Sequence, residues 1–201
     1  MKNLTTSCII LGHKNLGEND KVIFLYTEKR GKIRAIAKGA RKLTSKFTGH
    51  LETLNPCEIE LYFGPRQTII TEVISKKNLL KNVKDLKTIE ATLKIAEITN
   101  RMIFEDQIIE NLIPLMKETL NKITTNKEKI ELIKNTYIIK LLNKTGFAPD
   151  FKENSLKLKK KYINFFEYIK THSITEINKI KLNTEEKTDI ENITEQLLSN
   201  C

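Results

Sequence analysis

Eight basic side chains fall within eighteen consecutive residues of this chain, and no aspartate or glutamate lies among them. They are Lys29, Arg30, Lys32, Arg34, Lys38, Arg41, Lys42 and Lys46. Ammonium and guanidinium groups bind phosphate oxygens, and a one-sided cluster of charge is typical of a surface with a polyanionic partner. The alternative is a solvated loop in a lysine-rich protein. We predict that these eight residues contact the phosphates of a nucleic acid.

A protein that binds single strands also needs aromatic rings on which bases can stack. The N-terminal third offers Phe24, Tyr26, Phe47, Tyr62 and Phe63. Alternate residues of a strand share a face, so about half of these rings belong to a core. Tyr62 shares its face with two glutamates, and Phe47 ends the basic run. We therefore predict stacking by Phe47 and Tyr62, with plain packing as the alternative for each.

Residues suited to catalysis or to metal binding do not form a convincing set. Glu18 and Asp20 lie in a Gly-Glu-Asn-Asp turn, where carboxylates usually accept hydrogen bonds from the turn itself. The three histidines have no partner spaced for nucleophilic catalysis. The three cysteines, Cys8, Cys57 and Cys201, are too scattered for a zinc site or a disulfide framework, and the first two are expected to be small buried hydrophobes. We predict no catalytic residue, metal or cofactor.

The overall charge agrees with a polyanionic partner. The 201 residues include 35 lysines and arginines against 25 acids, a formal net charge of +10. Residues 1–76 hold 13 basic and 7 acidic side chains, so the excess is concentrated there. No apolar run approaches the roughly 20 residues of a membrane span, and the N-terminal apolar patch is too short for a signal peptide. We expect a cytoplasmic protein without a membrane partner.

The basic run is placed by a series of short strands. Five β-rich stretches, bounded by glycine-containing turns, cover residues 5–13, 21–28, 32–39, 57–64 and 67–75. The long link after the third strand favours a small OB-type barrel, and an SH3-like barrel is the alternative.

From residue 77 onward the period becomes helical. Ile89, Leu93, Ala96 and Ile103 are predicted to form one face of a helix over 86–104. Four further helices follow, the second of them stopped by Gly146, and Ser173 with Glu176 forms a capping box. The prediction is an α+β chain: an OB-fold nucleic-acid-binding domain over residues 1–78, packed on an all-helical domain over 79–201.

The stretch "LGHKNLGENDKVIFLYTEKRGKIRAIAKGARKLTSKF" resembles the RecO family of bacterial recombination mediators. It has the Gly-Glu-x-Asp turn of Gly17 to Asp20, a hydrophobic strand ending in Thr27, Gly31–Lys32, and the "AxAKGAR" of Ala35–Arg41. "LLNKTGFAPD" at 141–150 is similar to the family's leucine-rich helix that ends in Gly-aromatic-x-Pro-Asp.

The resemblance implies an OB-fold followed by a helical domain and a non-enzymatic role in DNA repair and homologous recombination. It implies binding of single- and double-stranded DNA by the eight basic residues, annealing of complementary strands, and help in loading the recombinase. It also implies two protein partners, RecR and the acidic C-terminal tail of single-strand-binding protein, and a nucleoid-associated location. Arg101 and Lys140 are the candidate cations for that tail. A general OB-fold binder of RNA or single strands is one alternative, and a helical adaptor with a purely structural barrel is another.

Two departures from the family pattern concern the C-terminal part. Many relatives carry a four-cysteine zinc module soon after the Gly-aromatic-x-Pro-Asp motif, whereas "FKENSLKLKKKY" follows here, so no zinc is expected. The basic closing segment of the family is also missing, and "KLKKKY" at 157–162 is a candidate substitute.

Overall fold

The computed structural model describes residues 2–75, 80–81, 83–153 and 157–201. The chain forms two compact units. The barrel unit comprises Met1–Val83 and Ala96–Ile113, and the helical unit comprises Lys84–Ile95 and Pro114–Cys201. The boundary predicted between residues 78 and 79 lies outside the described residues.

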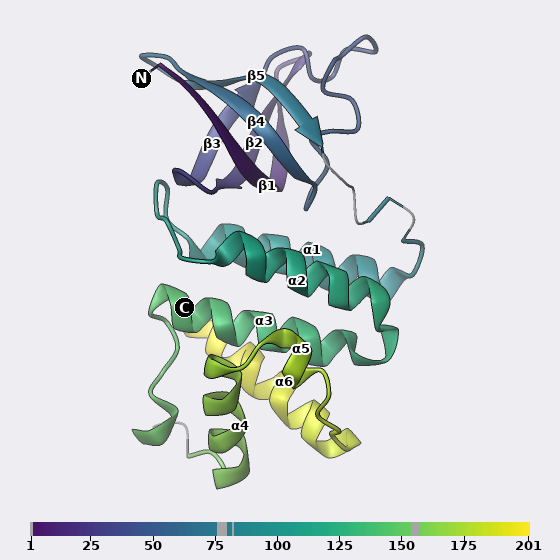
Figure 1. Ribbon diagram of the computed structural model, residues 1–201, viewed down its shortest axis with the longest axis vertical. Helices are drawn as coiled ribbons and strands as arrows, with labels where there is room; N and C mark the ends of the chain where they lie inside the picture. The colour runs from purple at the N-terminus through teal and green to yellow at the C-terminus, as the bar shows by residue number, and fades with distance from the viewer. Residues whose placement is uncertain (1, 76–79, 82, 154–156) are drawn as a thin grey trace. The chain divides into compact units, whose positions relative to one another are not determined.

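The five strands of the barrel unit close into a barrel in the order β1-β2-β3-β5-β4 (Figure 1). They are β1 (Asn3–Leu16), β2 (Asp20–Thr27), β3 (Gly31–Ala37), β4 (Pro56–Phe63) and β5 (Thr68–Ser75). All neighbours are antiparallel except β3 and β5, which run parallel where Ile36 pairs with Ile69. A closed five-stranded barrel of this order is of the OB type, which confirms the predicted fold class.

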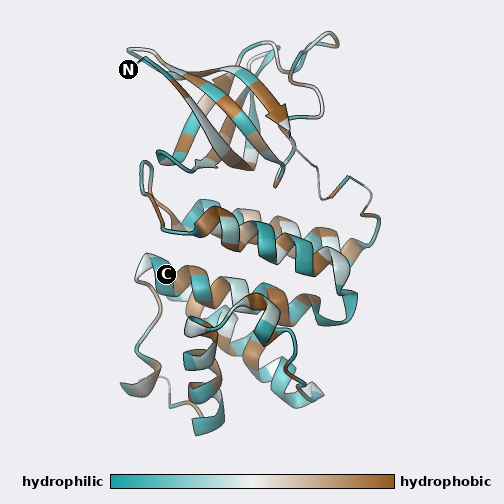
Figure 2. Ribbon diagram, in the orientation of Figure 1, coloured by the Kyte–Doolittle hydropathy of each residue, from teal (hydrophilic) through white to brown (hydrophobic). Residues whose placement is uncertain are grey.

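The interior of the barrel is filled by alternate residues of each strand. On β3 the inward side chains are Ile33, Ala35 and Ala37, all buried. Figure 2 shows the resulting bands of hydrophobic and hydrophilic residues along the strands. The outward side chains of the same strands are therefore the ones that can meet a ligand.

Six α-helices lie in the described residues that follow the barrel strands. They are α1 (Leu86–Met102), α2 (Leu112–Thr125), α3 (Ile130–Thr145), α4 (Lys160–Thr171), α5 (Ile174–Ile177) and α6 (Thr184–Ser199), with short 3₁₀ turns at Lys127–Lys129 and Phe151–Glu153. In the helical unit, α4, α5 and α6 pack against α3, whose side chains Tyr137, Leu141 and Leu142 are buried. These helices confirm the predicted helical part.

The predicted helix signals have the expected geometry. Gly146 follows α3 with a φ of +81°, a conformation that glycine adopts readily, and its N–H donates to the carbonyl of Asn143. Ser173 and Glu176 form the predicted capping box at the start of α5. A second capping box, Asn183 with Glu186, begins α6 and was not predicted.

The buried face of α1 differs from the predicted one. Leu93 is 49% exposed, whereas three threonines, Thr88, Thr92 and Thr99, are buried. The Thr92 hydroxyl donates to the carbonyl of Ile89 at 2.8 Å, so its polar atom is paired within the helix. A threonine whose hydroxyl is paired in this way presents only its methyl group to the core. The predicted stripe is therefore wrong at Leu93, whereas Ala96 and Ile103 are buried as predicted.

Residues 96–113 belong to the barrel unit because they pack on the outer surface of β2 and β3. The Tyr26 hydroxyl accepts a hydrogen bond from the backbone N–H of Ile109 at 2.6 Å and donates to the Ile109 carbonyl at 3.0 Å. Gly31 has a φ of +65°, and a Cβ there would lie 2.0 Å from the carbonyl oxygen of Gln107. Only glycine allows this close approach, so Gly31 fixes the segment against the turn between β2 and β3.

Within the described part of the chain, none of the helices combines the length and the apolar character that crossing a bilayer requires.

Candidate nucleic-acid interface

The outer surface of β2 and β3 has a covered end and an open end. Tyr26 and Lys32 are directly opposite on the two strands, and residues 96–113 cover this pair. The next outward pairs, Phe24 with Arg34 and Val22 with Ile36, are only partly buried or exposed. The open end of the surface is therefore the part that can accept a ligand.

A groove of about 630 Å³ lies over this open end. Its lining comes from the end of β1, from β2 and β3, from the turn between β4 and β5 with the first residue of β5, and from Glu105. The lining residues are Lys14, Asn15, Leu16, Val22, Phe24, Arg34, Ile36, Arg66, Gln67, Thr68 and Glu105. The strand 2–3 surface and the β1–β2 and β4–β5 loops are where OB barrels bind oligonucleotides.

Three cations and one aromatic ring give this groove its chemistry. Lys14, Arg34 and Arg66 come from three different parts of the barrel. The Lys14 ammonium lies 5.9 Å from the centre of the Phe24 ring, which is partly exposed on β2. Phosphate-binding cations beside an aromatic face are the two components of a single-strand binding surface.

One acid lies among these cations. The Glu105 carboxylate is 4.0 Å from Nε of Arg34, and both side chains are 64% exposed. An ion pair this long and this exposed contributes little to stability. A phosphate group can therefore displace Glu105 from Arg34 at small cost.

The link that follows β3 is fixed next to the groove. The backbone N–H of Arg41 donates to the carbonyl of Asn19, and its guanidinium donates to the carbonyl of Gly17 at 2.7 Å. The N–H of Gly39 donates to the carboxylate of Asp20 at 2.8 Å. Asp20 thus accepts a hydrogen bond from the link after β3, whereas the sequence had suggested one from its own turn. These bonds hold the exposed side chains of Lys38 and Lys42 near the β1–β2 turn.

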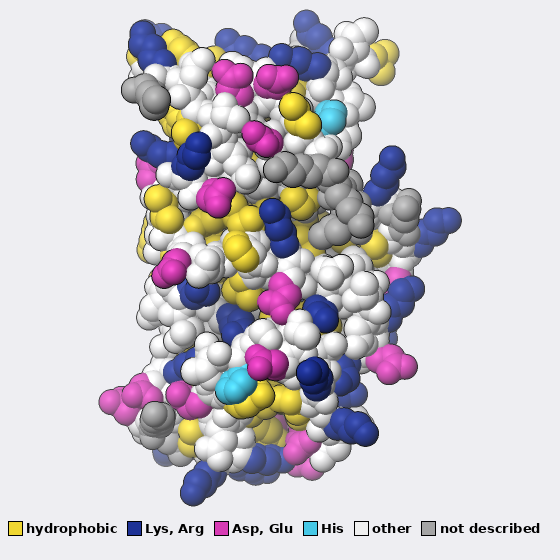
Figure 3. All heavy atoms as spheres, in the orientation of Figure 1, with side chains coloured by type: hydrophobic (Ala, Val, Ile, Leu, Met, Phe, Trp, Pro, Cys, Tyr) yellow, Lys and Arg dark blue, Asp and Glu magenta, His cyan; other side chains and the backbone are white. Residues whose placement is uncertain are grey.

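The outer surface of β4 and β5 carries the opposite charge. Glu58, Glu60 and Glu72 are outward residues of these strands, and Glu60 is directly opposite Glu72. Figure 3 shows acidic side chains gathered in the middle of the visible face of the barrel, with lysine and arginine side chains toward its margin. A polyanion is therefore directed to the β2–β3 side.

The eight predicted basic residues do not form a single surface. Lys29 and Arg30 occupy the turn at the covered end of β2 and β3, where Arg30 pairs with Asp106 at 3.1 Å. Arg34 lies in the groove, and Lys38, Arg41 and Lys42 lie beyond the other end of β3. Lys46 donates to the carbonyl of Thr71 at 2.7 Å. The block is split because a strand of seven residues separates its two parts by about 20 Å.

Lys32 has a structural role that the sequence did not suggest. Its ammonium donates to the backbone carbonyls of Asn100 and Ile103, the latter at 2.8 Å, at the end of α1. Burial lowers the pKa of Lys32, and nearby Glu105 opposes this shift. An ammonium bound to helix-terminal carbonyls is a C-terminal cap. We therefore no longer expect Lys32 to contact DNA.

The predicted stacking residues also have other positions. Phe47 is only 5% exposed and belongs to the barrel core, so it has no face on which a base could stack. Tyr62 is partly buried on β4, outside the groove. The ring in the groove is Phe24, which the sequence had placed among the five candidates. Its position opposite Arg34 on the neighbouring strand is the signal that could have selected it.

The two residues predicted to bind a partner's tail belong to different units. Arg101 lies in the barrel unit at the end of α1 and is exposed. Lys140 lies in the helical unit on α3, where burial lowers its pKa. Binding of the tail by either residue stays a prediction.

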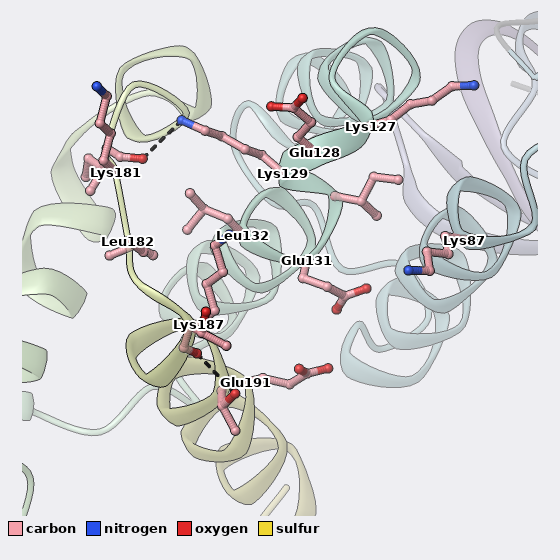
Figure 4. A pocket seen from close by; sticks show the side chains of 14 residues that line it. Lys87, Lys127, Glu128, Lys129, Glu131, Leu132, Lys181, Leu182, Lys187 and Glu191 are labelled. Atoms are coloured by element: carbon pink, nitrogen blue, oxygen red, sulfur yellow. Dashed lines mark hydrogen bonds between the residues drawn. The ribbon is translucent and has the colours of Figure 1, made fainter.

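The helical unit contains a cavity of about 500 Å³ between the start of α1, the start of α3 and the region of α6 (Figure 4). Five lysines contribute to its lining: Lys87, Lys127, Lys129, Lys181 and Lys187. Leu132 and Leu182 are part of the lining as well, and three glutamates complete it. Lys129 is committed to the backbone carbonyls of Asn178 and Ile180, so four lysines remain to meet a ligand.

No group of three or more histidine, cysteine, aspartate or glutamate side chains converges as a metal site within the described ranges. What the barrel surface can do is bind phosphates with three convergent cations and hold a base on Phe24.

Two family models match the chain in succession. The model described as "Recombination protein O N terminal" matches residues 1–90, and "Recombination protein O C terminal" matches residues 83–156. The chain belongs to the RecO family. The resemblance found in the sequence is thereby confirmed, and the proposed groove lies almost entirely within the first of the two matched regions.

Individual members of the RecO family agree with this assignment. The DNA repair protein RecO of Clostridium novyi is 31% identical over 148 residues, which is 74% of this chain and 58% of that protein. The DNA repair protein RecO of Syntrophobacter fumaroxidans is 32% identical over 154 residues, 74% of this chain and 59% of that protein. That of Thermoanaerobacter sp. is 27% identical over 169 residues, 83% of this chain and 67% of that protein. The chain thus spans about three fifths of the length of the first two relatives.

Proposed function

We propose that this RecO family chain acts in DNA repair by binding DNA strands in the groove on β2 and β3. The observation that carries the proposal is the convergence of Lys14, Arg34 and Arg66 beside the Phe24 ring. These residues come from separate parts of the sequence, and the barrel order brings them to one surface. The relatives that match are named DNA repair proteins.

The groove would bind a single strand without reading its sequence. Phosphates would lie against the three cations, and one base would stack on Phe24, because every base has a face that can stack. Lys38 and Lys42 would extend the path beyond the end of β3, and duplex DNA would use the same cations through its phosphates. Glu105 would be displaced from Arg34 when a phosphate binds.

Annealing follows from this mode of binding. Two complementary strands repel each other through their phosphates, and cations that neutralise those phosphates reduce the repulsion. Most bases would remain unstacked from the protein and available for pairing. We therefore propose a mediator that promotes pairing by binding and has no enzymatic step.

We propose the helical unit as the docking region for the acidic tail of single-strand-binding protein. Four lysines, partly offset by three glutamates, lie around Leu132 and Leu182 and provide the charge and apolar surface that an acidic peptide with a hydrophobic end needs. We prefer this cavity to the two separate candidates, Arg101 and Lys140, that the sequence offered. RecR as a partner and recombinase loading remain proposals from the family.

The test is a fluorescence anisotropy titration of the full chain with single-stranded DNA, duplex DNA and RNA of one sequence. Strands of about 16 nucleotides cover the upper range of an OB barrel. We expect salt-dependent binding of both DNA forms and acceleration of annealing between complementary strands. RNA bound more tightly than single-stranded DNA, with no annealing, would favour the general RNA binder instead. The absence of binding to all three would overturn the proposal.

A further inference from the structure

Two thiols face each other inside the barrel. Cys8 on β1 and Cys57 on β4 are directly opposite in the strand register. Their sulfur atoms are 3.2 Å apart, and the residues are 1% and 2% exposed. The two cysteines are not joined in a disulfide. The sequence separation of 49 residues gave no reason to expect that they meet.

The backbone around these thiols has the dimensions that a disulfide requires. Residues directly opposite in an antiparallel pair have Cα atoms about 4.5 or 5.5 Å apart. Both values lie within the roughly 4.4 to 6.8 Å found across disulfides. A bond therefore needs only small side-chain rotations that bring the sulfur atoms together, and it leaves the strand pairing intact.

The pair lies toward one end of the barrel, where the chain can open locally. Cys57 is the second residue of β4, and its other neighbour across the sheet is Ser75, the last residue of β5. The Ser75 hydroxyl lies 2.8 Å from Nδ1 of His50, in the link between β3 and β4. The link between β3 and β4 therefore covers the end of the barrel at which Cys57 lies.

The last part of this link is held at some cost. Leu54 has a φ of +62°, which is unfavourable for a residue with a branched side chain. The buried side-chain oxygen of Asn55 accepts no hydrogen bond from any described residue. Phe47, Leu51 and Leu54 of the same link are buried, so a peroxide reaches the thiols only when this end of the barrel opens transiently.

We propose that Cys8 and Cys57 form an oxidation site that closes to a disulfide in the presence of a peroxide. One thiol attacks the peroxide, one oxygen is transferred to that sulfur to give a sulfenic acid, and one water is released. The second thiol then attacks this sulfur and expels the second water. Two thiols and one hydrogen peroxide give one disulfide and two waters, so the two electrons lost by the sulfurs reduce the peroxide. The site is independent of the DNA-binding proposal.

The bond would close a covalent loop that contains β2, β3 and the link between β3 and β4. Cross-linking such a loop restricts the unfolded chain and should raise the thermal unfolding temperature by roughly 8–16 °C for a chain of this length. Small reducing dithiols would reverse it. The barrel would therefore be more resistant to unfolding in its oxidised form.

The test uses the full chain with Cys201→Ser, which removes the exposed third thiol. The protein is exposed to a graded series of hydrogen peroxide concentrations, treated with catalase, and denatured in the presence of N-ethylmaleimide. The intact mass of the protein then shows how many of the two thiols have reacted with N-ethylmaleimide. We expect two adducts before oxidation, none after it with a mass about 2 Da lower, and two again after treatment with dithiothreitol.

Two matched controls make the result decisive. In Cys8→Ala, and equally in Cys57→Ala, each also carrying Cys201→Ser, the remaining thiol has no partner for a disulfide, so peroxide can only add oxygen to its sulfur and the mass should never fall by about 2 Da. The unsubstituted chain serves as a reference, because oxidation of its exposed Cys201 shows which peroxide concentration oxidises an accessible thiol. Retention of both buried adducts when Cys201 is fully oxidised would overturn the proposal. So would a mass gain of sulfinic acids in place of the disulfide, or the same mass loss of about 2 Da in the single-cysteine variants.

Discussion

Neutralising the groove should weaken DNA binding and reduce its salt dependence. The change is Lys14→Ala, Arg34→Ala and Arg66→Ala together in the full chain. All three side chains line the groove, and none belongs to the barrel core. We expect a normally folded protein, checked by circular dichroism and thermal unfolding, with a lower affinity for single-stranded DNA. The assay is fluorescence anisotropy over a series of salt concentrations.

The magnitude follows from the number of phosphates lost. Each phosphate neutralised on a single strand contributes about −0.7 to the slope of log K against log salt, so three contacts contribute about −2. Between about 50 and 200 mM salt, a slope change of this size alters the ratio of the two affinities by a factor of roughly 20. The difference between the two proteins should thus be largest at low salt and shrink as salt rises.

The acid in the groove supplies a change of opposite sign. Glu105→Gln removes the carboxylate 4.0 Å from Arg34 and should strengthen DNA binding. Glu72→Gln is the matched control, because it removes an equal charge from the acidic β4–β5 surface. If the triple variant kept the original slope, or if both glutamine variants changed affinity equally, the groove would not be the DNA path.

Three further outcomes are expected. Lys32→Met should leave DNA affinity unchanged but lower the free energy of unfolding by about 1–3 kcal/mol in urea titrations, because two hydrogen bonds to helix carbonyls are lost; unchanged stability with weakened DNA binding would reverse this assignment. Burial and the neighbouring Glu131 raise the pKa of the Glu191 carboxyl, because both disfavour its charged form in the folded protein. The stability that this shift contributes is fully present below the pKa of the unfolded chain, and it is lost as the pH rises through the higher pKa of the folded state. Glu191→Gln should therefore raise the unfolding temperature at pH 7 and have no effect at about pH 4; an equal shift at both pH values would contradict the charge argument. The purified chain should contain no stoichiometric zinc by elemental analysis, and chelators should change neither its unfolding temperature nor annealing, since its three cysteines cannot form a four-cysteine site.

The features that could be predicted from the sequence are those set by neighbouring residues. Alternation of Ile33, Ala35 and Ala37 was enough to place β3 and its inward face. Gly146 and the Ser173–Glu176 pair marked helix ends because caps depend on residues within one turn. The family resemblance was also carried by contiguous motifs.

The groove could not be predicted in the same way because its residues are distant in sequence. Lys14 and Arg66 are isolated cations that no local pattern distinguishes, and only the closed barrel places them beside Arg34. Conversely, Lys32 lies in the conspicuous basic run and Phe47 directly follows it, yet Lys32 caps α1 and Phe47 fills the core. Their roles depend on segments that return to them from elsewhere in the chain.

The division of the chain into its two units has a consequence for how the gene can be recombined. The backbone passes from one unit to the other at 83/84, 95/96 and 113/114, so the barrel unit is encoded in two separate pieces. A chimera joined after residue 90, where the first family model ends, would combine Tyr26, Gly31 and Lys32 of one parent with residues 96–113 of the other. Tyr26, Lys32 and Gly31 would then contact a segment from the other parent. We therefore expect the two pieces to be inherited together, and substitutions in one piece to be accompanied by substitutions in the other.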